Sequence, residues 1–275
     1  MKREVAPELL DELPPQDLRA RGSRNDLLRI NAWMGNARTI ATALSTAFDG
    51  TKPATLIDLG GGDGRFLLQV ARRLGPQWQG TMASLVDRQG LVSTDTFCQF
   101  KRLGWILELR QADIFDWLGE HSAYPNAIIL ANLFLHHFSP HQLAQLLRLS
   151  ARRASLFAAV EPRRSLMGVF FSRLVLLIGC NAVTRHDAPV SVRAGFKGRE
   201  LSALWTSATA TRQEQFDTAG IQIHSGSGGF AAQPNLREHW TFIERSAGFF
   251  SHLFLARAST PRAANFSAHA VPALK

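Results

Sequence analysis

The chain has 275 residues, of which 45% are hydrophobic and 19% are charged, a balance that excludes an intrinsically disordered chain. Glycine shows no fixed period along the sequence, which excludes collagen-like and low-complexity classes. At this length we expect one large domain with added segments rather than two equal domains.

Two cysteines, Cys98 and Cys180, are too few for a disulfide framework or a cysteine-rich zinc site. The segment MKREVAPELLDELPP lacks the apolar core of a secretory signal, so we expect a cytoplasmic protein. The apolar stretch Leu166–Val183 has nearly the length of a membrane span, but Arg173 lies at its middle. An arginine there costs at least ~2.5 kcal/mol on insertion scales, so we predict a buried or half-buried helix instead.

The net charge is +9, and most of the excess lies in one part of the chain. Between Arg148 and Arg212 there are 11 basic residues and 3 acidic ones. Such a segment could attract a nucleic acid, an anionic membrane or a small acidic substrate, or it could simply be a set of solvated helix faces.

Taken in chain order, residues 1–50 have the apolar spacing of a helix pair broken near Gly35. Strands and helices then alternate. Apolar runs predict strands at 54–59, 81–87, 105–110, 126–132 and 155–161. Helical patterns follow at 64–75, 95–104 and 139–153, the last with Ser139 as N-cap and Pro140 at its first position, whereas 112–118 is assigned to a loop.

Strands that alternate with helices of about ten residues predict a parallel α/β sheet covered on both faces. Two further strands, at 239–245 and 250–258, are joined by so short a connection that they form an antiparallel pair. We therefore divide the chain into a helical extension or lid (1–50), a main domain (51–258) and a flexible tail (259–275). The less regular segment 162–238 is assigned to a cap over the substrate.

The most informative stretch is LIDLGGGDGRF, in which a strand ends at Leu59 and a helix begins after Gly60, Gly61, Gly62 and Gly64. Glycines at this junction let a ligand approach the backbone, at the sheet edge where open α/β folds bind ligands. A dinucleotide site would require G-x-G-x-x-G, but its third glycine falls on Arg65. The carboxylates of Asp58 and Asp63 suit a ligand with an ammonium and a sulfonium, which S-adenosylmethionine has.

Polar residues also end the next three strands of the predicted sheet. Asp87, followed by Arg88, ends the second strand, where an acid can bind both ribose hydroxyls. Asp113 follows the third strand beside Ile114, where a carboxylate can accept a hydrogen bond from an adenine amino group. Asn132 ends the fourth strand. These residues occur in order at four successive carboxyl edges, which favours a single ligand site.

With these residues, the sequence resembles the class I S-adenosylmethionine-dependent methyltransferases over about residues 50 to 257. The resemblance implies a seven-stranded, mostly parallel Rossmann-like sheet with an antiparallel last strand. It also implies that Asp58 and Gly60–Gly62 contact the cofactor, that Asp87 binds the ribose and that Asp113 and Ile114 contact the adenine. The stretch NLFLHHFSP is similar to the fourth motif of the small-molecule branch. INAWMGNAR and RHDAPVSVRAGFKGREL resemble bacterial enzymes that act on aromatic or polyketide-like metabolites.

Two features of other methyltransferase branches are missing from the sequence, which narrows the kind of atom that is methylated. No N-P-P-Y run follows the fourth strand, which disfavours methylation of adenine or glutamine amide nitrogens. Neither cysteine follows a proline, so the thiolate used for pyrimidine C5 methylation has no candidate.

Methyl transfer is an in-line displacement that often requires a base to deprotonate the acceptor. His136, His137 and His186 are the candidates, although His136 could instead cap the helix near Ser139, and an ionised acceptor needs no base. Trp33, Arg163 and Arg193 are candidates for binding the acceptor, the arginines through bidentate pairing with a carboxylate or phenolate. We expect no metal.

The leading hypothesis is therefore O-methylation of a small aromatic or acidic metabolite. The alternatives are an RNA or protein methyltransferase recruited by the basic segment, and a non-catalytic methyltransferase-like partner subunit. We expect a small-molecule substrate and no membrane span. Nucleic acid is disfavoured because no run of five basic residues occurs, and a homodimer is left open.

Overall fold

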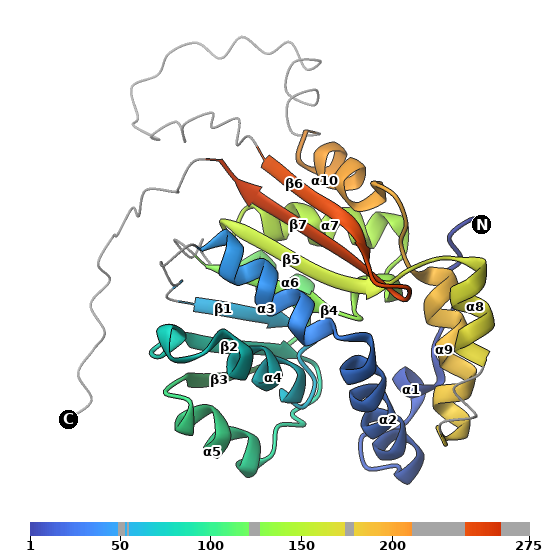
Figure 1. Ribbon diagram of the computed structural model, residues 1–275, viewed down its shortest axis with the longest axis horizontal. Coiled ribbons are helices and arrows are strands. Elements are labelled where there is room, and N and C mark those ends of the chain that lie inside the picture. Colours follow the sequence, from blue (N-terminus) through green and yellow to red (C-terminus); the bar gives the residue numbers. More distant parts are fainter. Residues whose placement is uncertain (49–52, 54, 121–126, 174–178, 211–239, 260–275) are drawn as a thin grey trace, which may run out of the picture.

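A computed structural model gives the arrangement of the chain (Figure 1). It describes residues 1–48, 53, 55–120, 127–173, 179–210 and 240–259. The tail beyond Ser259 lies outside these residues, as does most of the second half of the predicted cap.

A seven-stranded sheet in the order β3-β2-β1-β4-β5-β7-β6 forms the centre of the molecule. Its strands are β1 Thr55–Leu59, β2 Met82–Asp87, β3 Ile106–Gln111, β4 Ile128–Asn132, β5 Leu156–Pro162, β6 Trp240–Ala247 and β7 Ser251–Ala258. Strands β1 to β5 pair in parallel, whereas β7 is antiparallel to both β5 and β6. The predicted strands and the antiparallel closing pair are thus confirmed.

Alternate side chains of each strand point to opposite faces, and each face has its own core. Leu56 and Leu130 pack on one face, Ile57 and Ile129 on the other. The first face is covered by α3 (Asn36–Ala47), α4 (Arg65–Leu74) and α5 (Thr94–Arg102). The second is covered by α6 (Ile114–Glu120), α7 (Pro140–Ala151) and α10 (Glu200–Ala210).

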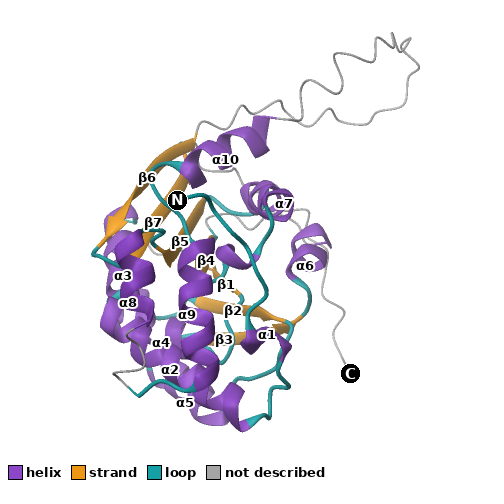
Figure 2. Cartoon of the chain, turned by 90° about the vertical axis from the view of Figure 1, so that its right-hand side faces the viewer, coloured by secondary structure: helices purple, strands orange, loops and turns teal. Residues whose placement is uncertain are grey.

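Four helices gather at the carboxyl ends of the parallel strands, on the right of Figure 1 and facing the viewer in Figure 2. They are α1 (Leu9–Glu12), α2 (Leu18–Met34), α8 (Leu166–Arg173) and α9 (Ala182–Ala194). The predicted break between α2 and α3 is confirmed at Gly35, which has a φ of 70°. Because α3 packs into the main core through Ile40 and Leu44, only the part before Gly35 lies over the sheet edge.

Two sequence predictions are wrong. Residues 112–118 were assigned to a loop, but α6 begins at Ile114, with the Asp113 carboxylate accepting a hydrogen bond from the Phe115 amide. The single helix expected over Leu166–Val183 is divided, because α8 ends at Arg173 and α9 starts after Asn181, whose side chain caps it by accepting from the Thr184 amide. In the described part of the chain, no helix is both long and apolar enough to cross a membrane.

The predicted N-cap of α7 can be tested directly. The Ser139 hydroxyl accepts from the Gln142 amide, and the Gln142 side chain accepts from the Ser139 amide, which completes a capping box. We expect Ser139→Ala to lower the free energy of unfolding by about 1 kcal/mol in urea denaturation. His141→Ala, an exposed change in the same helical turn, is the control. Equal stability of the two variants would contradict the cap.

Candidate active site

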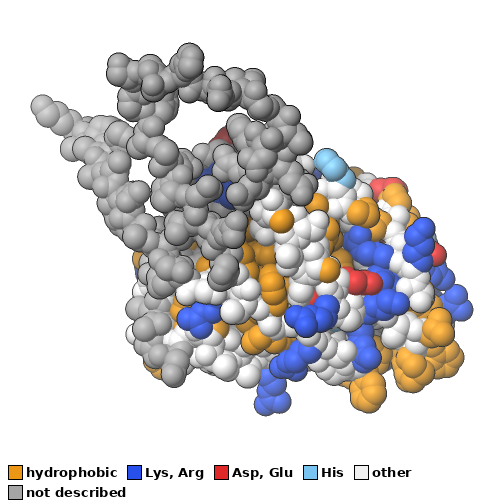
Figure 3. Space-filling model, turned by 90° about the horizontal axis from the view of Figure 1, so that it is seen from above, with side chains coloured by type: hydrophobic (Ala, Val, Ile, Leu, Met, Phe, Trp, Pro, Cys, Tyr) orange, Lys and Arg blue, Asp and Glu red, His pale blue; other side chains and the backbone are white. Residues whose placement is uncertain are grey.

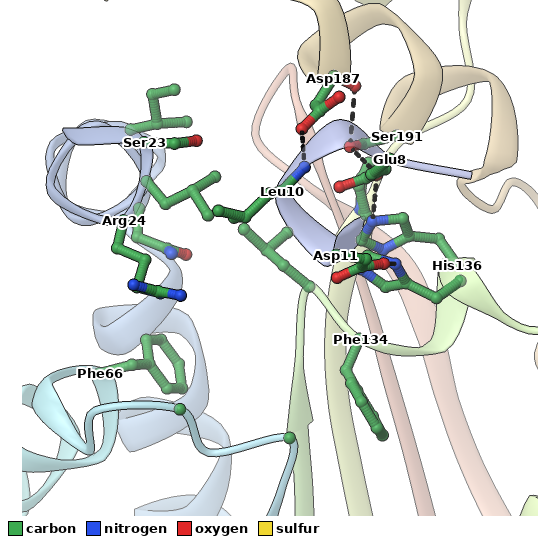
Figure 4. A pocket seen from close by; sticks show the side chains of 18 of the residues that line it. Glu8, Leu10, Asp11, Ser23, Arg24, Phe66, Phe134, His136, Asp187 and Ser191 are labelled. Carbon is green, nitrogen blue, oxygen red and sulfur yellow. Dashed lines mark hydrogen bonds and ion pairs between the residues drawn. The ribbon is translucent and has the colours of Figure 1, made fainter. Parts of the chain in front are cut away.

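A cavity of about 730 Å³ lies between the carboxyl edge of the sheet and the four helices at that edge (Figure 4). Its floor includes Gly60, Gly61 and Gly62, and its side walls come from α2, α8 and α9. This volume is in the upper half of the range found for small-molecule sites, so the cavity has room for more than one small ligand.

Two glycines of the loop have a positive φ but different surroundings. Gly60 has a φ of 67°, and a Cβ at this position would lie 2.3 Å from the ring of Phe134. Gly62 has a φ of 54°, and no atom lies within 4 Å of an added Cβ there. The loop therefore needs glycine at residue 60 for its packing, while residue 62 presents bare backbone to open space.

Asp87 connects this loop to the next strand. One of its carboxylate oxygens accepts from the Gly62 amide at 3.0 Å, and the other accepts from the Gln89 amide at 2.7 Å. Each oxygen retains a lone pair, so a carboxylate held in a fixed orientation faces the cavity. Farther along the wall, the Arg88 Nε lies 4.0 Å from an oxygen of Asp113, beside the buried Ile114.

Asp58 lies behind the loop rather than in the cavity wall. It is 2% exposed, and its Oδ2 has no hydrogen-bond partner among the described residues. Burial, together with the negative charge of Asp87, raises the pKa of the Asp58 carboxyl to about 8. A cation bound near this group would favour its ionised form.

His136 is held between two carboxylates. Its Nδ1 lies 2.8 Å from Glu161, and its Nε2 lies 3.3 Å from Glu8. Burial by itself would lower the pKa of His136, but the hydrogen bonds and charges of Glu161 and Glu8 outweigh it and raise the pKa to about 9. His136 is therefore an imidazolium at neutral pH, which disfavours it as a neutral base there.

The N-terminal segment supplies one wall of the site, as Figure 4 shows for Glu8, Leu10 and Asp11. Asp187 of α9 accepts from the Leu9 and Leu10 amides, and the Ser191 hydroxyl donates to Glu8. A further contact of this segment, made by Asp11, bears on the chemistry of the site.

The Asp11 carboxylate lies 3.0 Å from Nδ1 of His137, a residue that lines the cavity. A proton on Nδ1 donates to Asp11 and leaves the Nε2 of a neutral His137 free to accept a proton. Asp11 therefore gives His137 the tautomer that a base requires.

The structure brings most of the predicted site together. Among the described residues, the cavity wall contains Gly60, Gly61, Gly62, Asp87, Arg88, Asp113, Ile114, His136, His137 and Trp33. It does not include Asp58, Asn132, His186, Arg163 or Arg193.

The residues left out of the wall have other partners. The Asn132 amide bonds to the side chains of Asn31 and Asn36, and Asn31 reaches the cavity in its place. His186 is exposed and pairs with Asp187 on the outer side of α9. The Arg163 amide donates to Phe250, which anchors the backbone ahead of α8.

Several wall residues were not predicted, namely Glu8, Asp11, Asn31, Asp187 and Ser191. Three of them lie in stretches that carry the resemblance, Asn31 in INAWMGNAR and both Asp187 and Ser191 in RHDAPVSVRAGFKGREL, whereas Glu8 and Asp11 had no such signal.

One group of side chains could also ligate a metal. Glu8, His136 and His137 each offer an atom within 4.8 Å of the other two. The Nδ1 atoms of both histidines already bond to carboxylates, and Glu8 bonds to His136 and Ser191. We describe the group as an ion-pair network, since these polar atoms satisfy one another without an ion.

No protein-family model matches the chain, and no curated protein matches its sequence. Solved structures do match it. An O-methyltransferase family protein from Burkholderia thailandensis aligns with 90% of this chain and 64% of its own, at 16% identity and a TM-score of 0.51. The plantazolicin methyltransferase BpumL, solved with SAH, aligns with 88% of this chain and 91% of its own, at 14% identity and a TM-score of 0.55.

The small RNA methyltransferase HEN1 aligns with 81% of this chain but 25% of its own, at 14% identity and a TM-score of 0.50. The chain has the fold of class I S-adenosylmethionine-dependent methyltransferases. The predicted fold class is confirmed. Because the sequence identities are only 14–16%, the similarity shows a shared fold and not a shared substrate. Because the methyltransferase fold occurs here in proteins named for small-molecule and for RNA substrates, the substrate has to be argued from the cavity.

The His136–Glu8 pair predicts a pH dependence of stability. The pKa of His136 is raised in the folded state, so its contribution is complete below about 6.5 and is lost as pH rises through about 9. The pKa of Glu8 is lowered to about 2, because the contacts with His136, His137 and Ser191 outweigh burial. The contribution of Glu8 is therefore present above about pH 4.5 and falls as pH drops through 2.

We expect Glu8→Gln to lower the free energy of unfolding by up to about 3 kcal/mol near pH 5.5, and by much less at pH ~9.5. Urea denaturation at both pH values measures this difference. Glu4→Gln changes an exposed acid of the same segment and is the matched control. A loss for Glu8→Gln that is the same at both pH values would refute the ion pair.

Proposed function

We propose that this chain is an S-adenosylmethionine-dependent methyltransferase that methylates an oxygen of a small aromatic or acidic metabolite. The observation that carries the proposal is the carboxylate of Asp87 fixed against the Gly62 amide at the floor of the cavity. The methyltransferase fold, with the glycine loop at its carboxyl edge, supports the same conclusion.

The residues present fit this cofactor. Gly62 offers backbone that no side chain covers, and Asp87 has two oxygens oriented for a pair of hydroxyls. Asp58, whose Oδ2 has no partner among the described residues, lies close to the loop and can ionise when a cation binds there, which suits a cationic ligand better than a pyrophosphate. When bound, S-adenosylmethionine supplies an electrophilic methyl group on a sulfonium.

The acceptor would occupy the remaining, mostly apolar part of the cavity. Apolar side chains from α2, from the loop after β4, from α8 and from the turn between β6 and β7 line it, including Leu27, Leu28, Trp33, Met34, Phe134, Phe138, Phe171 and Phe250. Such walls bind a ring or alkyl group and exclude water from it. Trp33 thus stays our candidate for an acceptor contact, whereas Arg163 and Arg193 lie outside the wall.

His137 is our candidate for the base. It lines the cavity, and the hydrogen bond of its Nδ1 to Asp11 leaves Nε2 able to take a proton from a hydroxyl acceptor. His136 holds its proton between Glu8 and Glu161, so both of its ring nitrogens are engaged and neither can take a proton from the acceptor. His186 has no access to the cavity wall in the described residues, so it has no part in this mechanism.

The RNA or protein alternative rests on the basic segment, and part of that charge is internal. Arg164 is buried, donates to the Gly195 carbonyl and pairs with Glu200. Side chains from four helices, α1, α2, α8 and α9, also line the cavity, whereas an extended strand is bound along an open groove. A small acceptor therefore fits better.

Cofactor binding can be tested at Asp87. We expect Asp87→Ala to weaken the binding of S-adenosylhomocysteine in calorimetry by at least roughly 10- to 150-fold, because a single lost hydrogen bond to a charged group is worth about 1.5–3 kcal/mol and Asp87 can accept two from the ribose. Asp95→Ala, an exposed acid on α5, should bind like wild type. If Asp87→Ala retains wild-type affinity, the ribose role of this residue is wrong.

The base can be tested by pH–rate profiles. His137→Ala should lower kcat by roughly 10²–10⁴ and abolish the rise of kcat/KM with pH, while cofactor affinity stays within a few-fold. Asp11→Asn should lower kcat less and keep the rise, because a less well oriented imidazole remains. His141→Ala is the matched control. A His137→Ala variant that keeps both the rise and most of kcat would remove His137 from the mechanism.

A further inference from the structure

Aromatic side chains from three elements meet where the cavity reaches the surface. Trp33 of α2, Phe171 of α8 and Phe250 in the turn between β6 and β7 all line the cavity. The ring centroids of Trp33 and Phe250 are 4.8 Å apart, and those of Phe171 and Phe250 are 5.6 Å apart. The cavity is therefore bordered at this point by aromatic rings that pack in tilted and edge-to-face pairs.

The same cluster continues onto the outer surface. Phe170 packs on Phe171, and Phe249 packs on Phe250. Phe170 is 58% exposed, and both Leu166 and Phe249 are 79% exposed. We call the exposed members the apolar rim, which consists of Trp33, Leu166, Met167, Phe170, Phe171 and Phe249. Exposed apolar side chains that cluster in this way mark an interaction surface, since single scattered ones are the norm.

Basic side chains predominate in the segments that carry the apolar rim. The segments that carry the rim, residues 27–47, 163–173 and 245–253, contain no aspartate or glutamate. They contain Arg29, Arg38, Arg163, Arg164, Arg173 and Arg245, of which Arg164 is buried and Arg29 pairs with Asp26 just outside the first segment. Figure 3 shows hydrophobic side chains at the right-hand edge of the molecule, on the side of α8, with Lys and Arg side chains beside them.

We propose that the apolar rim is a docking surface for an anionic lipid bilayer, which places the mouth of the cavity at the membrane surface. Apolar side chains that enter the interfacial region, ringed by basic side chains that meet lipid phosphates, are the two elements of peripheral membrane binding. An apolar acceptor dissolved in the bilayer then reaches the cavity past Trp33 and Phe171 without crossing water.

A second copy of the chain fits this surface less well. A two-fold interface would bring the rim of each copy against the other, and with it the arginines of both. No exposed acid in these segments offsets that repulsion. A bilayer containing anionic lipid supplies the missing negative charge.

Vesicle flotation tests the proposal without any methyl-transfer assay. The full chain should float with vesicles of phosphatidylcholine and phosphatidylglycerol, less with phosphatidylcholine alone, and less as salt is raised. The double variant Phe170→Ser/Phe249→Ser should bind at least ~10-fold more weakly, because two large apolar groups no longer enter the lipid. Ile106→Ser, which is 61% exposed on β3 at the far edge of the sheet, is the matched control.

The contribution of the basic side chains to vesicle binding is tested with the double variant Arg173→Gln/Arg245→Gln. Its control is the double variant Lys101→Gln/Arg102→Gln on α5. Melting temperatures verify that every variant is folded. Only the first pair should reduce binding to the anionic vesicles. No flotation of the wild type, or equal flotation of the rim variant and Ile106→Ser, would overturn the proposal. So would a loss of dimer mass in the rim variant without a change in flotation, which would assign the rim to a second copy.

Discussion

The carboxylate of Glu161 holds the site together. It is fully buried at the end of β5 and accepts hydrogen bonds from the amides of Phe134, Leu135 and His136, as well as from the His136 ring. These hydrogen bonds offset the cost of removing the carboxylate from water. They also hold the loop after β4 in a fixed position against the end of β5. The loop after β4 is thereby shaped, so that Phe134 packs over Gly60 and His137 faces the cavity.

Much of the fold could be predicted because local patterns and long-range order agree. The apolar runs of β1, β4 and β5 are buried on both faces, which gives each of them a continuous signal. The helix α6 could not be predicted within residues 112–118, because it has only seven residues and its start depends on the hydrogen bond to the Asp113 carboxylate. The division between α8 and α9 was hidden by continuous hydrophobicity, although Asn181 is an ordinary N-cap.

Site residues could be predicted only where the order of the strands in the sheet itself places them side by side. Parallel strands end at one edge, so Gly62, Asp87 and Asp113 had to be neighbours once the sheet order was known. Asp11 and His137, by contrast, are separated by 126 residues and meet only because the N-terminal segment lies along α9. Arg193 was expected in the cavity from its charge alone, and sequence gives no sign of which way a helix turns its side chains.

The N-terminal segment that brings Glu8, Leu10 and Asp11 to the cavity contains one helix of only four residues, so its position depends on what it touches. The Arg3 guanidinium donates to the carbonyls of Ala194 and Phe138 and lies over the ring of Phe196, at the far end of this segment from Asp11. Segments held by a few polar contacts open at a much lower free energy than sheets do. Exchange of ligands past the N-terminal segment therefore requires only that this segment detach locally from α9. The sheet beneath it can stay in place.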